Sequence, residues 1–252
     1  MGRIARIVIL ALVVALVGLV AQPAWAAPPL PASMAAIGDS ITRAYDVCCS
    51  YGDHPGQSWS TGATSYDGIA SHYERIRQLN SAITGHADND AVTGAKMSAA
   101  PGQATQAVSQ GARYVTILMG ANDLCTSSVS TMTSTTTFRA QFSQAMATLM
   151  AQDRKPYVFV SSIPNLYQLW TVLHTNSLAR WAWANFHICQ SMLAATNTDP
   201  NASKSGIARW RSTRSWLRSV RSTPAVAGMA GRSTTTSSAP ARSAPWTSSI
   251  PA

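Results

Sequence analysis

Short apolar runs bounded by Gly or Pro alternate along this chain with stretches of helical periodicity. Three of the runs, residues 34–37, 114–119 and 157–161, have the length of a strand. Continuous apolar runs are typical of strands buried on both faces, and their alternation with helices indicates βα units around a largely parallel sheet. We therefore predict a layered α/β domain.

Apolar side chains recur at intervals of three and four residues between Tyr66 and Ile76 and between Phe138 and Leu149. This spacing places them on one face of a helix, so both stretches are predicted to be amphipathic helices that contribute to the core. A third helix is predicted over residues 177–194. No Gly-rich phosphate loop occurs in the sequence, so no nucleotide cofactor is expected.

A serine follows the first predicted strand in the segment Ile37-Gly38-Asp39-Ser40-Ile41. Ligands of open α/β sheets bind at the carboxyl ends of the strands, so Ser40 occupies the position of a nucleophile. The other interpretation is a turn or a helix N-cap, because serine is favoured at both.

A second polar segment, Gly120-Ala121-Asn122-Asp123, follows the predicted strand 114–119. It too lies at the carboxyl end of a strand, so Asn122 and Ser40 are expected to face one crevice. The other interpretation is a simple turn, because Asn and Asp are favoured in turns. Between these segments, residues 89–95 are predicted as a short strand that ends in Gly94, where a backbone N–H can approach a ligand closely.

These three segments together resemble the SGNH or GDSL hydrolases, which are secreted or periplasmic esterases and lipases with a flavodoxin-like three-layer α/β/α fold. Ser40 of G-D-S-I is similar to the nucleophile of the first family block, Gly94 to the glycine of the second, and Asn122 to the asparagine of the third. The resemblance spans roughly residues 34–200. It implies a secreted serine hydrolase that cleaves carboxylic esters of lipids or carbohydrates, with no metal and no cofactor.

The residues suit acyl transfer, in which negative charge develops on the former carbonyl oxygen. On the resemblance, the oxyanion hole consists of the backbone N–H groups of Ser40 and Gly94 and the side-chain amide of Asn122. Asp39 and Asp123 are expected to shape the two loops through hydrogen bonds to backbone rather than to act as acids.

The fourth family block, D-x-x-H, would supply the general base and its carboxylate, and this chain does not contain it. None of its five histidines has Asp three positions earlier: His54, His72, His86, His174 and His187. We therefore expect the general base and its Asp to be absent and turnover to be low.

Residues 207–252 contain seven Arg, sixteen Ser or Thr and no acidic residue. One interpretation is a basic, disordered tail rich in Ser, Thr, Arg and Pro. The other is a one-base frame slip near residues 205–210, because this composition is typical of a GC-rich gene translated out of frame. On that hypothesis residues 27–206 form an incomplete hydrolase domain, and the C-terminal part is irregular.

The genetic code supports the slip. Trp has the single codon TGG and Thr codons begin with AC, so the shifted triplet that starts at the last base of Trp246 is GAC, which encodes aspartate. The third triplet after it joins the last base of Ser249 to the AT of Ile250, and it encodes histidine when that base is C. The shifted frame therefore permits D-x-x-H.

Residues 1–26 have a basic start, an apolar run and a small-x-small end at Ala24-Trp25-Ala26, as in a secretory signal. We expect cleavage after Ala26, secretion, and no stable membrane anchor afterwards. The net charge of +9 arises at the two ends of the chain, since residues 27–206 hold ten basic and ten acidic residues. A neutral central domain makes nucleic acid an unexpected partner.

The four cysteines are expected to form disulfides, because an exported chain meets an oxidising compartment. Cys125 with Cys189 is the preferred pair. Cys48 and Cys49 are adjacent, and we expect them not to bond to each other without strain.

The alternative function is a non-catalytic ester- or glycan-binding module. Four tryptophans are candidates to line a sugar or acyl site, and packing is their other role: Trp59, Trp170, Trp181 and Trp183. In either case the expected partner is a small-molecule, lipid or carbohydrate ester.

Overall fold

The computed structural model describes residues 29–64 and 67–194. The chain divides into residues 1–30 and residues 31–252, and every helix and strand below belongs to the second of these units. The predicted signal segment 1–26, the tail 207–252 and Tyr66 lie outside the described residues.

Four parallel strands form one sheet in the order β2-β1-β3-β4. Their bounds are β1 (Met34–Gly38), β2 (Ala87–Asn89), β3 (Tyr114–Leu118) and β4 (Tyr157–Val160). Met34 lies opposite Ala87 and Tyr114, and Gly38 lies opposite Leu118. The predicted strands 34–37, 114–119 and 157–161 are therefore confirmed to within one residue at their ends.

The prediction of a strand over residues 89–95 is wrong, because β2 ends where that prediction begins. The Asn89 side-chain amide donates to the Thr42 carbonyl (3.0 Å) and to the Thr61 hydroxyl (2.9 Å), which ties the strand end to the β1 side. Beyond it, Ala95 N–H donates to the Val92 carbonyl (2.9 Å), so the chain forms a turn there.

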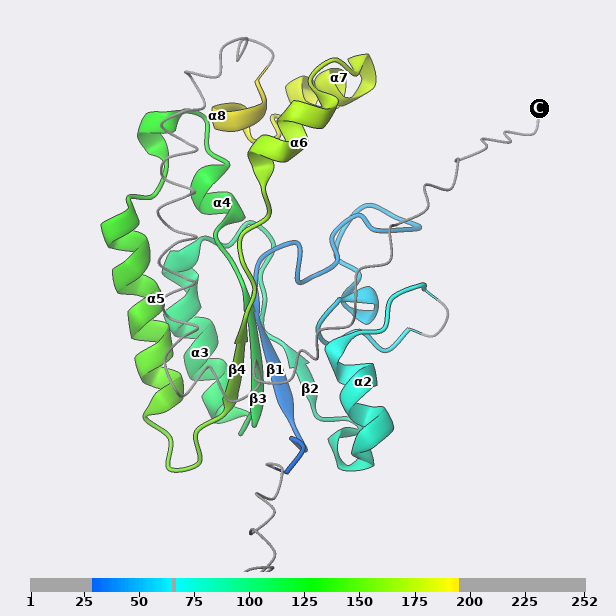
Figure 1. Ribbon diagram of the computed structural model, residues 1–252, viewed down its shortest axis with the longest axis vertical. Helices are drawn as coiled ribbons and strands as arrows, with labels where there is room; N and C mark the ends of the chain where they lie inside the picture. Colours follow the sequence, from blue (N-terminus) through cyan, green and yellow to red (C-terminus); the bar gives the residue numbers. More distant parts are fainter. Residues whose placement is uncertain (1–28, 65–66, 195–252) are drawn as a thin grey trace, which may run out of the picture. The chain divides into compact units, whose positions relative to one another are not determined.

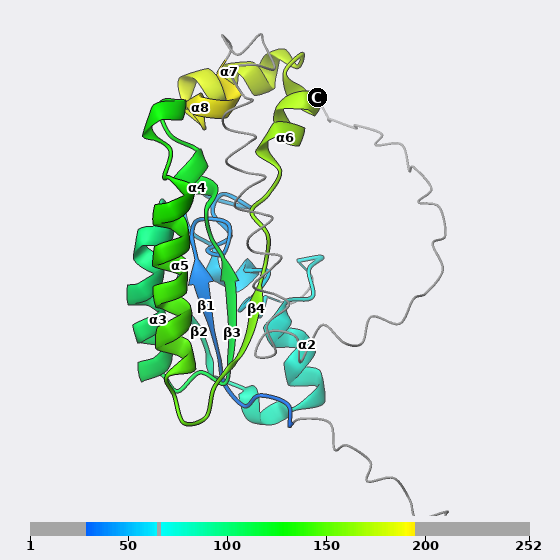
Figure 2. The same ribbon diagram turned by 60° about the vertical axis from the view of Figure 1, so that its left-hand side comes forward.

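Helices lie on both faces of the sheet and at its carboxyl end (Figure 1, Figure 2). α3 (Ala100–Ser109) and α5 (Thr135–Met150) cover one face, and α2 (His72–Leu79) covers the other. The short helices of the carboxyl end are α4 (Ala121–Leu124), α6 (Leu166–Leu173), α7 (Ser177–Asn185) and α8 (Gln190–Leu193). The described part also has the 3₁₀ turns η1 (Pro55–Gln57), η2 (Ser81–Ile83), η3 (Met97–Ala99) and η4 (Val129–Thr131). The predicted three-layer α/β arrangement is confirmed.

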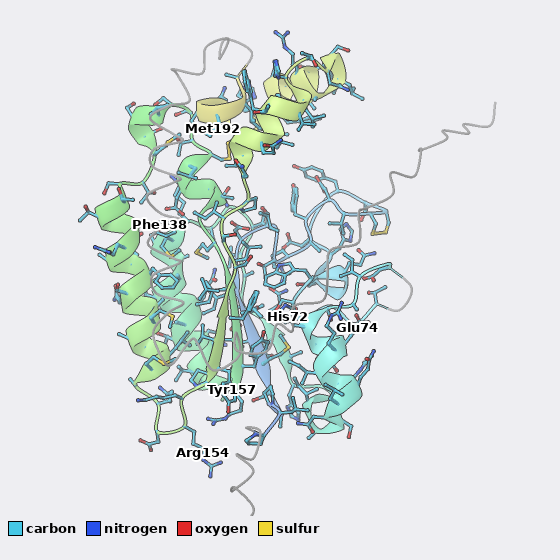
Figure 3. The ribbon with its side chains drawn as sticks, in the orientation of Figure 1. His72, Glu74, Phe138, Arg154, Tyr157 and Met192 are labelled. Carbon is cyan, nitrogen blue, oxygen red and sulfur yellow. A yellow bond between two sulfur atoms is a disulfide. The ribbon has the colours of Figure 1, made fainter. Side chains whose placement is uncertain are left out.

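The main core lies between the sheet and the α3–α5 layer, on the side where Figure 3 places Phe138. All residues of β1 and β3 are buried. α3 contributes only small buried apolar side chains, Ala100, Ala104 and Ala107, which allow its backbone to lie close to the sheet. His72 lies on the opposite face, between α2 and the sheet (Figure 3).

The helix predicted over residues 138–149 is confirmed, and the one predicted from Tyr66 to Ile76 is correct only in its second half. α2 begins at His72 because Ser71 and Glu74 form a capping box, in which each side chain accepts the other residue's backbone N–H. Ile69 precedes this cap and is 46% exposed, so it is not a core residue.

The single helix predicted over residues 177–194 is wrong, because α7 ends at Asn185 and α8 begins at Gln190. His187 and Cys189 between them have φ angles of 53° and 48°, which no α-helix accommodates. No helix within residues 29–64 and 67–194 has both the length and the apolar character needed to cross a bilayer.

Two disulfides join the four cysteines. The sulfurs of Cys125 and Cys189 are 2.07 Å apart and connect α4 to the start of α8 across 64 residues. The expectation for Cys48 and Cys49 is contradicted, since their sulfurs are also at bonding distance, 2.17 Å. Cys49 has a φ of 48°, and Ser50 N–H donates to the Cys48 carbonyl (2.7 Å), so a tight turn brings the two neighbours together.

Gly38→Ala tests the close packing at the end of β1. A Cβ there would lie 2.2 Å from the Thr42 Oγ1 and 2.8 Å from the Leu118 carbonyl oxygen, so we expect the free energy of unfolding to fall by about 1–3 kcal/mol. Gly102→Ala is the matched control, because no atom lies within 4 Å of its added Cβ. Inside α3 the alanine should raise stability by up to about 1 kcal/mol. Urea denaturation measures both, and equal stability of the Gly38→Ala and wild-type chains would contradict the packing described.

Candidate active site

Ser40 lies on a single helical turn that begins where β1 ends. The backbone N–H groups of Thr42 and Arg43 both donate to the Asp39 carbonyl (3.1 Å), and Tyr45 N–H donates to the Ser40 carbonyl (3.0 Å). The Asp39 carboxylate accepts the N–H of Ile41 (3.0 Å) and so caps this turn. Ser40 itself is partly exposed, and no side chain of the described residues hydrogen bonds to its hydroxyl.

Gln103 fixes the backbone from which this turn starts. Its buried side-chain amide on α3 accepts the Gly38 N–H (2.8 Å) and donates to the Gly38 carbonyl (3.1 Å). Because both bonds involve one amide group, the end of β1 is held in position two residues before Ser40. Gln103 was not among the residues expected to contribute to the site, since it lies far from every motif in the sequence.

Gly94 lies in the exposed turn that follows β2 and has a φ of 81°. A non-glycine side chain is disfavoured at this angle. Val92 N–H donates to the Gly38 carbonyl (3.2 Å), which anchors the start of this turn against the end of β1. The turn is therefore next to the strand end that carries Ser40.

Asn122 lies in α4, directly after β3. Gly120 precedes it with a φ of 121°, and a Cβ at Gly120 would lie 2.5 Å from the Ile163 Cδ1, so the β3–α4 connection requires a glycine. The Asn122 side-chain amide donates to the Ala95 carbonyl (3.0 Å). The residue expected from the third segment is thus in direct contact with the turn that contains Gly94.

The backbone N–H groups of Ser40 and Gly94 both lie at this end of the sheet. Within the residues that the structure describes, neither the Ser40 N–H nor the Gly94 N–H donates a hydrogen bond. Both are available to bind an anionic oxygen, as is the second N–H of the Asn122 amide.

Asp39 and Asp123 lie beneath these loops, and both are buried. The Asp123 carboxylate accepts the Met97 N–H (2.8 Å) and so holds the segment that follows the Gly94 turn. Burial raises the pKa of Asp39 to about 6, the negative charge of Asp123 adds to this increase, and the Ile41 N–H opposes it. Burial also raises the pKa of Asp123. Each carboxylate accepts one backbone N–H group, and its other oxygen is buried with no hydrogen-bond partner among the described residues.

The histidines lie elsewhere. His72 has the most buried ring: its Nδ1 lies 2.6 Å from the Tyr114 hydroxyl, and burial lowers its pKa. In the part of the chain that the structure describes, no histidine ring hydrogen bonds to Ser40 or to a carboxylate. The rings that bond to backbone carbonyls are those of His54, His174 and His187. Residues 29–64 and 67–194 also contain no group of three His, Cys, Asp or Glu side chains placed to hold a metal ion.

Comparison with known protein families gives a match. The family model described as GDSL-like Lipase/Acylhydrolase matches residues 34–201, which is more than half of the chain. The match begins at β1 and includes Ser40, Gly94 and Asn122. A search of curated proteins finds no match.

Asp39 makes stability depend on pH, and the sign follows from its raised pKa. The folded chain retains a proton that the unfolded chain releases near pH 3.8, so stability present at lower pH is lost as the pH rises from about 4 through about 6. The size is about 3 kcal/mol, since each pKa unit corresponds to about 1.4 kcal/mol. We expect Asp39→Asn to gain stability relative to wild type over this window.

Denaturant titrations at several pH values between 4 and 7 measure this difference. Asp153→Asn is the matched control, because Asp153 is exposed, and its curve should run parallel to that of the wild type. A constant difference between Asp39→Asn and wild type at every pH would contradict the buried carboxyl group.

Proposed function

The chain belongs to the GDSL-like lipase/acylhydrolase family, and we propose that its site cleaves carboxylic esters with Ser40 as the nucleophile. The observation that carries the proposal is the pair of backbone N–H groups, at Ser40 and Gly94, that have no acceptor among the described residues. Unpaired donors beside a serine hydroxyl are what the tetrahedral intermediate of acyl transfer requires.

In the first step the Ser40 Oγ bonds to the ester carbonyl carbon and its proton passes to a base. The carbonyl π electrons move to the oxygen, which becomes an oxyanion between the Ser40 N–H, the Gly94 N–H and the Asn122 amide. When the oxyanion collapses, the bond to the alkoxy group breaks and the alcohol leaves with a proton. Water then attacks the acyl group on Ser40 in the same way and releases the acid.

The site is incomplete because it lacks a general base to accept the Ser40 proton. The sequence has no D-x-x-H block, and no described histidine contacts Ser40. Without a base, the serine hydroxyl must lose its proton to water, and loss of one member of such a catalytic unit costs on the order of 10⁴–10⁶ in rate. We therefore propose a slow esterase whose nucleophile and oxyanion hole are present and whose base is missing, as the frame-slip hypothesis for residues 207–252 would explain.

The proposed substrates are acyl or acetyl esters of lipids or carbohydrates. Apolar side chains near both free donors support an acyl group there, since Ile41 beside Ser40 is 39% exposed and Val92 near Gly94 is 58% exposed. Two disulfides and the signal-like residues 1–26 support secretion.

Imidazole in the buffer tests the proposal by supplying the missing base. We expect release of p-nitrophenol from p-nitrophenyl acetate to be slow with the wild-type chain alone and to increase with imidazole, beyond the rate of imidazole without protein. Ser40→Ala should remove the whole of this increment, because the increment requires a serine oxygen that imidazole can deprotonate.

Ser81→Ala is the matched control, since Ser81 is exposed and follows α2 at a distance from the strand ends that carry the site. Its imidazole-dependent rate should equal that of the wild type. Equal increments in the Ser40→Ala and wild-type chains would contradict the proposed nucleophile. Saturable ester binding without any increment would favour the binding module instead.

A further inference from the structure

A chain of side-chain hydrogen bonds connects the turn of Ser40 to the turn of Gly94. Asp53 is its central member. One carboxylate oxygen of Asp53 pairs with the Arg43 Nε (2.9 Å), and the other accepts the Thr93 hydroxyl (2.5 Å). Because the two oxygens contact different segments, this one carboxylate joins both.

Each end of the chain of bonds is next to a free donor. Arg43 lies three residues after Ser40 on the turn that Asp39 caps, and its N–H donates to the Asp39 carbonyl (3.1 Å). Thr93 directly precedes Gly94. The series Arg43–Asp53–Thr93 therefore links the backbone that presents the Ser40 N–H to the backbone that presents the Gly94 N–H.

Arg43 is itself held at several points. Its Nη1 donates to the Asn89 carbonyl (3.4 Å) at the end of β2, and its own carbonyl accepts the His54 N–H (3.0 Å). The guanidinium group thus contacts both the Asp53 carboxylate and the end of β2, so the carboxylate has a defined position from which to bind Thr93.

The turn of Gly94 has few other restraints. Val92, Thr93 and Gly94 are exposed, and a glycine with a φ of 81° adds no side chain that packs. Asn122 binds the Ala95 carbonyl on one side of the turn, and Asp53 binds Thr93 on the other. Removing the Thr93 bond leaves the Gly94 turn held by the Asn122 bond on one side and by the bond from the Val92 N–H to the Gly38 carbonyl on the other, with no side-chain bond at the residue before Gly94.

The network contributes little to overall stability. The Arg43 and Asp53 side chains are 24% and 31% exposed, and ion pairs of this kind contribute about 0–1 kcal/mol. The Thr93 hydroxyl and Arg43 lower the pKa of Asp53, so the carboxylate stays ionised and keeps both contacts at neutral pH. The contacts therefore determine the positions of the two turns and contribute little to the stability of the domain.

We propose that Arg43, Asp53 and Thr93 are positioning residues that hold the Gly94 N–H in line with the Ser40 N–H around the oxyanion. The inference rests on the proposed function, because it assigns a role relative to the same reaction. It adds Arg43 and Asp53, which lie outside the three motifs, and Thr93, which lies beside Gly94 within residues 89–95.

Binding of butylboronic acid to Ser40 tests the inference in a chain without a base. The Ser40 oxygen bonds to the trigonal boron and its proton goes to water, so the boron becomes tetrahedral and negative, and one of the two hydroxyl groups of the boronic acid occupies the position of the oxyanion. Boron NMR measures the dissociation constant of this adduct. Imidazole-supported ester hydrolysis gives kcat and KM for the same variants.

We expect Thr93→Val and Asp53→Asn to weaken the boronate adduct and to lower kcat by about tenfold or more, since small displacements of catalytic groups cost up to about 10²-fold. KM should change little, because the oxyanion forms only after the ester is bound. Thr93→Ser retains the hydroxyl and should restore both values. Thr148→Val is the matched control, since this exposed hydroxyl binds only the Gln144 carbonyl of its own helix.

The possible outcomes distinguish a failure of the positioning role from a failure of the proposed function. A Ser40-dependent adduct that Thr93→Val and Asp53→Asn leave unchanged would overturn the positioning role alone. If no adduct forms, or if the adduct also forms with Ser40→Ala, the proposed function is contradicted. The inference then fails with it. If Thr93→Val destabilises the fold in denaturant titration, Asp53→Asn and the Thr93→Ser rescue decide whether the positioning role holds.

Discussion

The close approach of the β1 end to β3 and to its own following turn determines where the site forms. At Gly38 there is no room for a Cβ between the Thr42 side chain and the Leu118 carbonyl, and the Gln103 amide binds both backbone groups of this glycine. The chain therefore leaves the sheet at a fixed point and turns at once, which places Ser40 at the carboxyl end of a central strand. Parallel pairing brings the ends of β2 and β3 to the same edge, so the other two segments follow from the same constraint.

Two buried carboxylates maintain the loops at that edge. Burying a carboxylate is costly, and the backbone N–H groups that Asp39 and Asp123 accept offset only part of this cost, since burial still raises both pKa values. The loops thus have satisfied backbone groups below and unpaired ones, at Ser40 and Gly94, above. Donors fixed in this way need no rearrangement when charge develops on a substrate, which is the basis of electrostatic preorganisation.

Local sequence patterns predicted the elements whose formation depends on residues close together in the sequence. Continuous apolar runs predicted β1, β3 and β4, and parallel-sheet geometry placed Ser40 and Asn122 after the ends of β1 and β3, whereas Gly94 lies in a turn beyond the end of β2. The patterns failed where another interaction overrides periodicity: a capping box starts α2 late, and the Cys125–Cys189 disulfide accompanies a left-handed break before α8. α3 was not predicted because its buried face is alanine rather than large apolar residues. Gln103 and the Asp53–Thr93 bond were not predictable, since their partners lie 65 and 40 residues away in sequence.

The central claim is that an ester carbonyl is attacked by the Ser40 oxygen between the free donors of this site. Peptide mapping by mass spectrometry after incubation with p-nitrophenyl acetate and imidazole tests it directly, because a site without its own base should also release the acyl group slowly. The account predicts one acetyl group on the peptide that contains Ser40, and its loss when the chain is unfolded before incubation. Acetylation confined to exposed lysine or tyrosine side chains, with Ser40 unmodified, would contradict it.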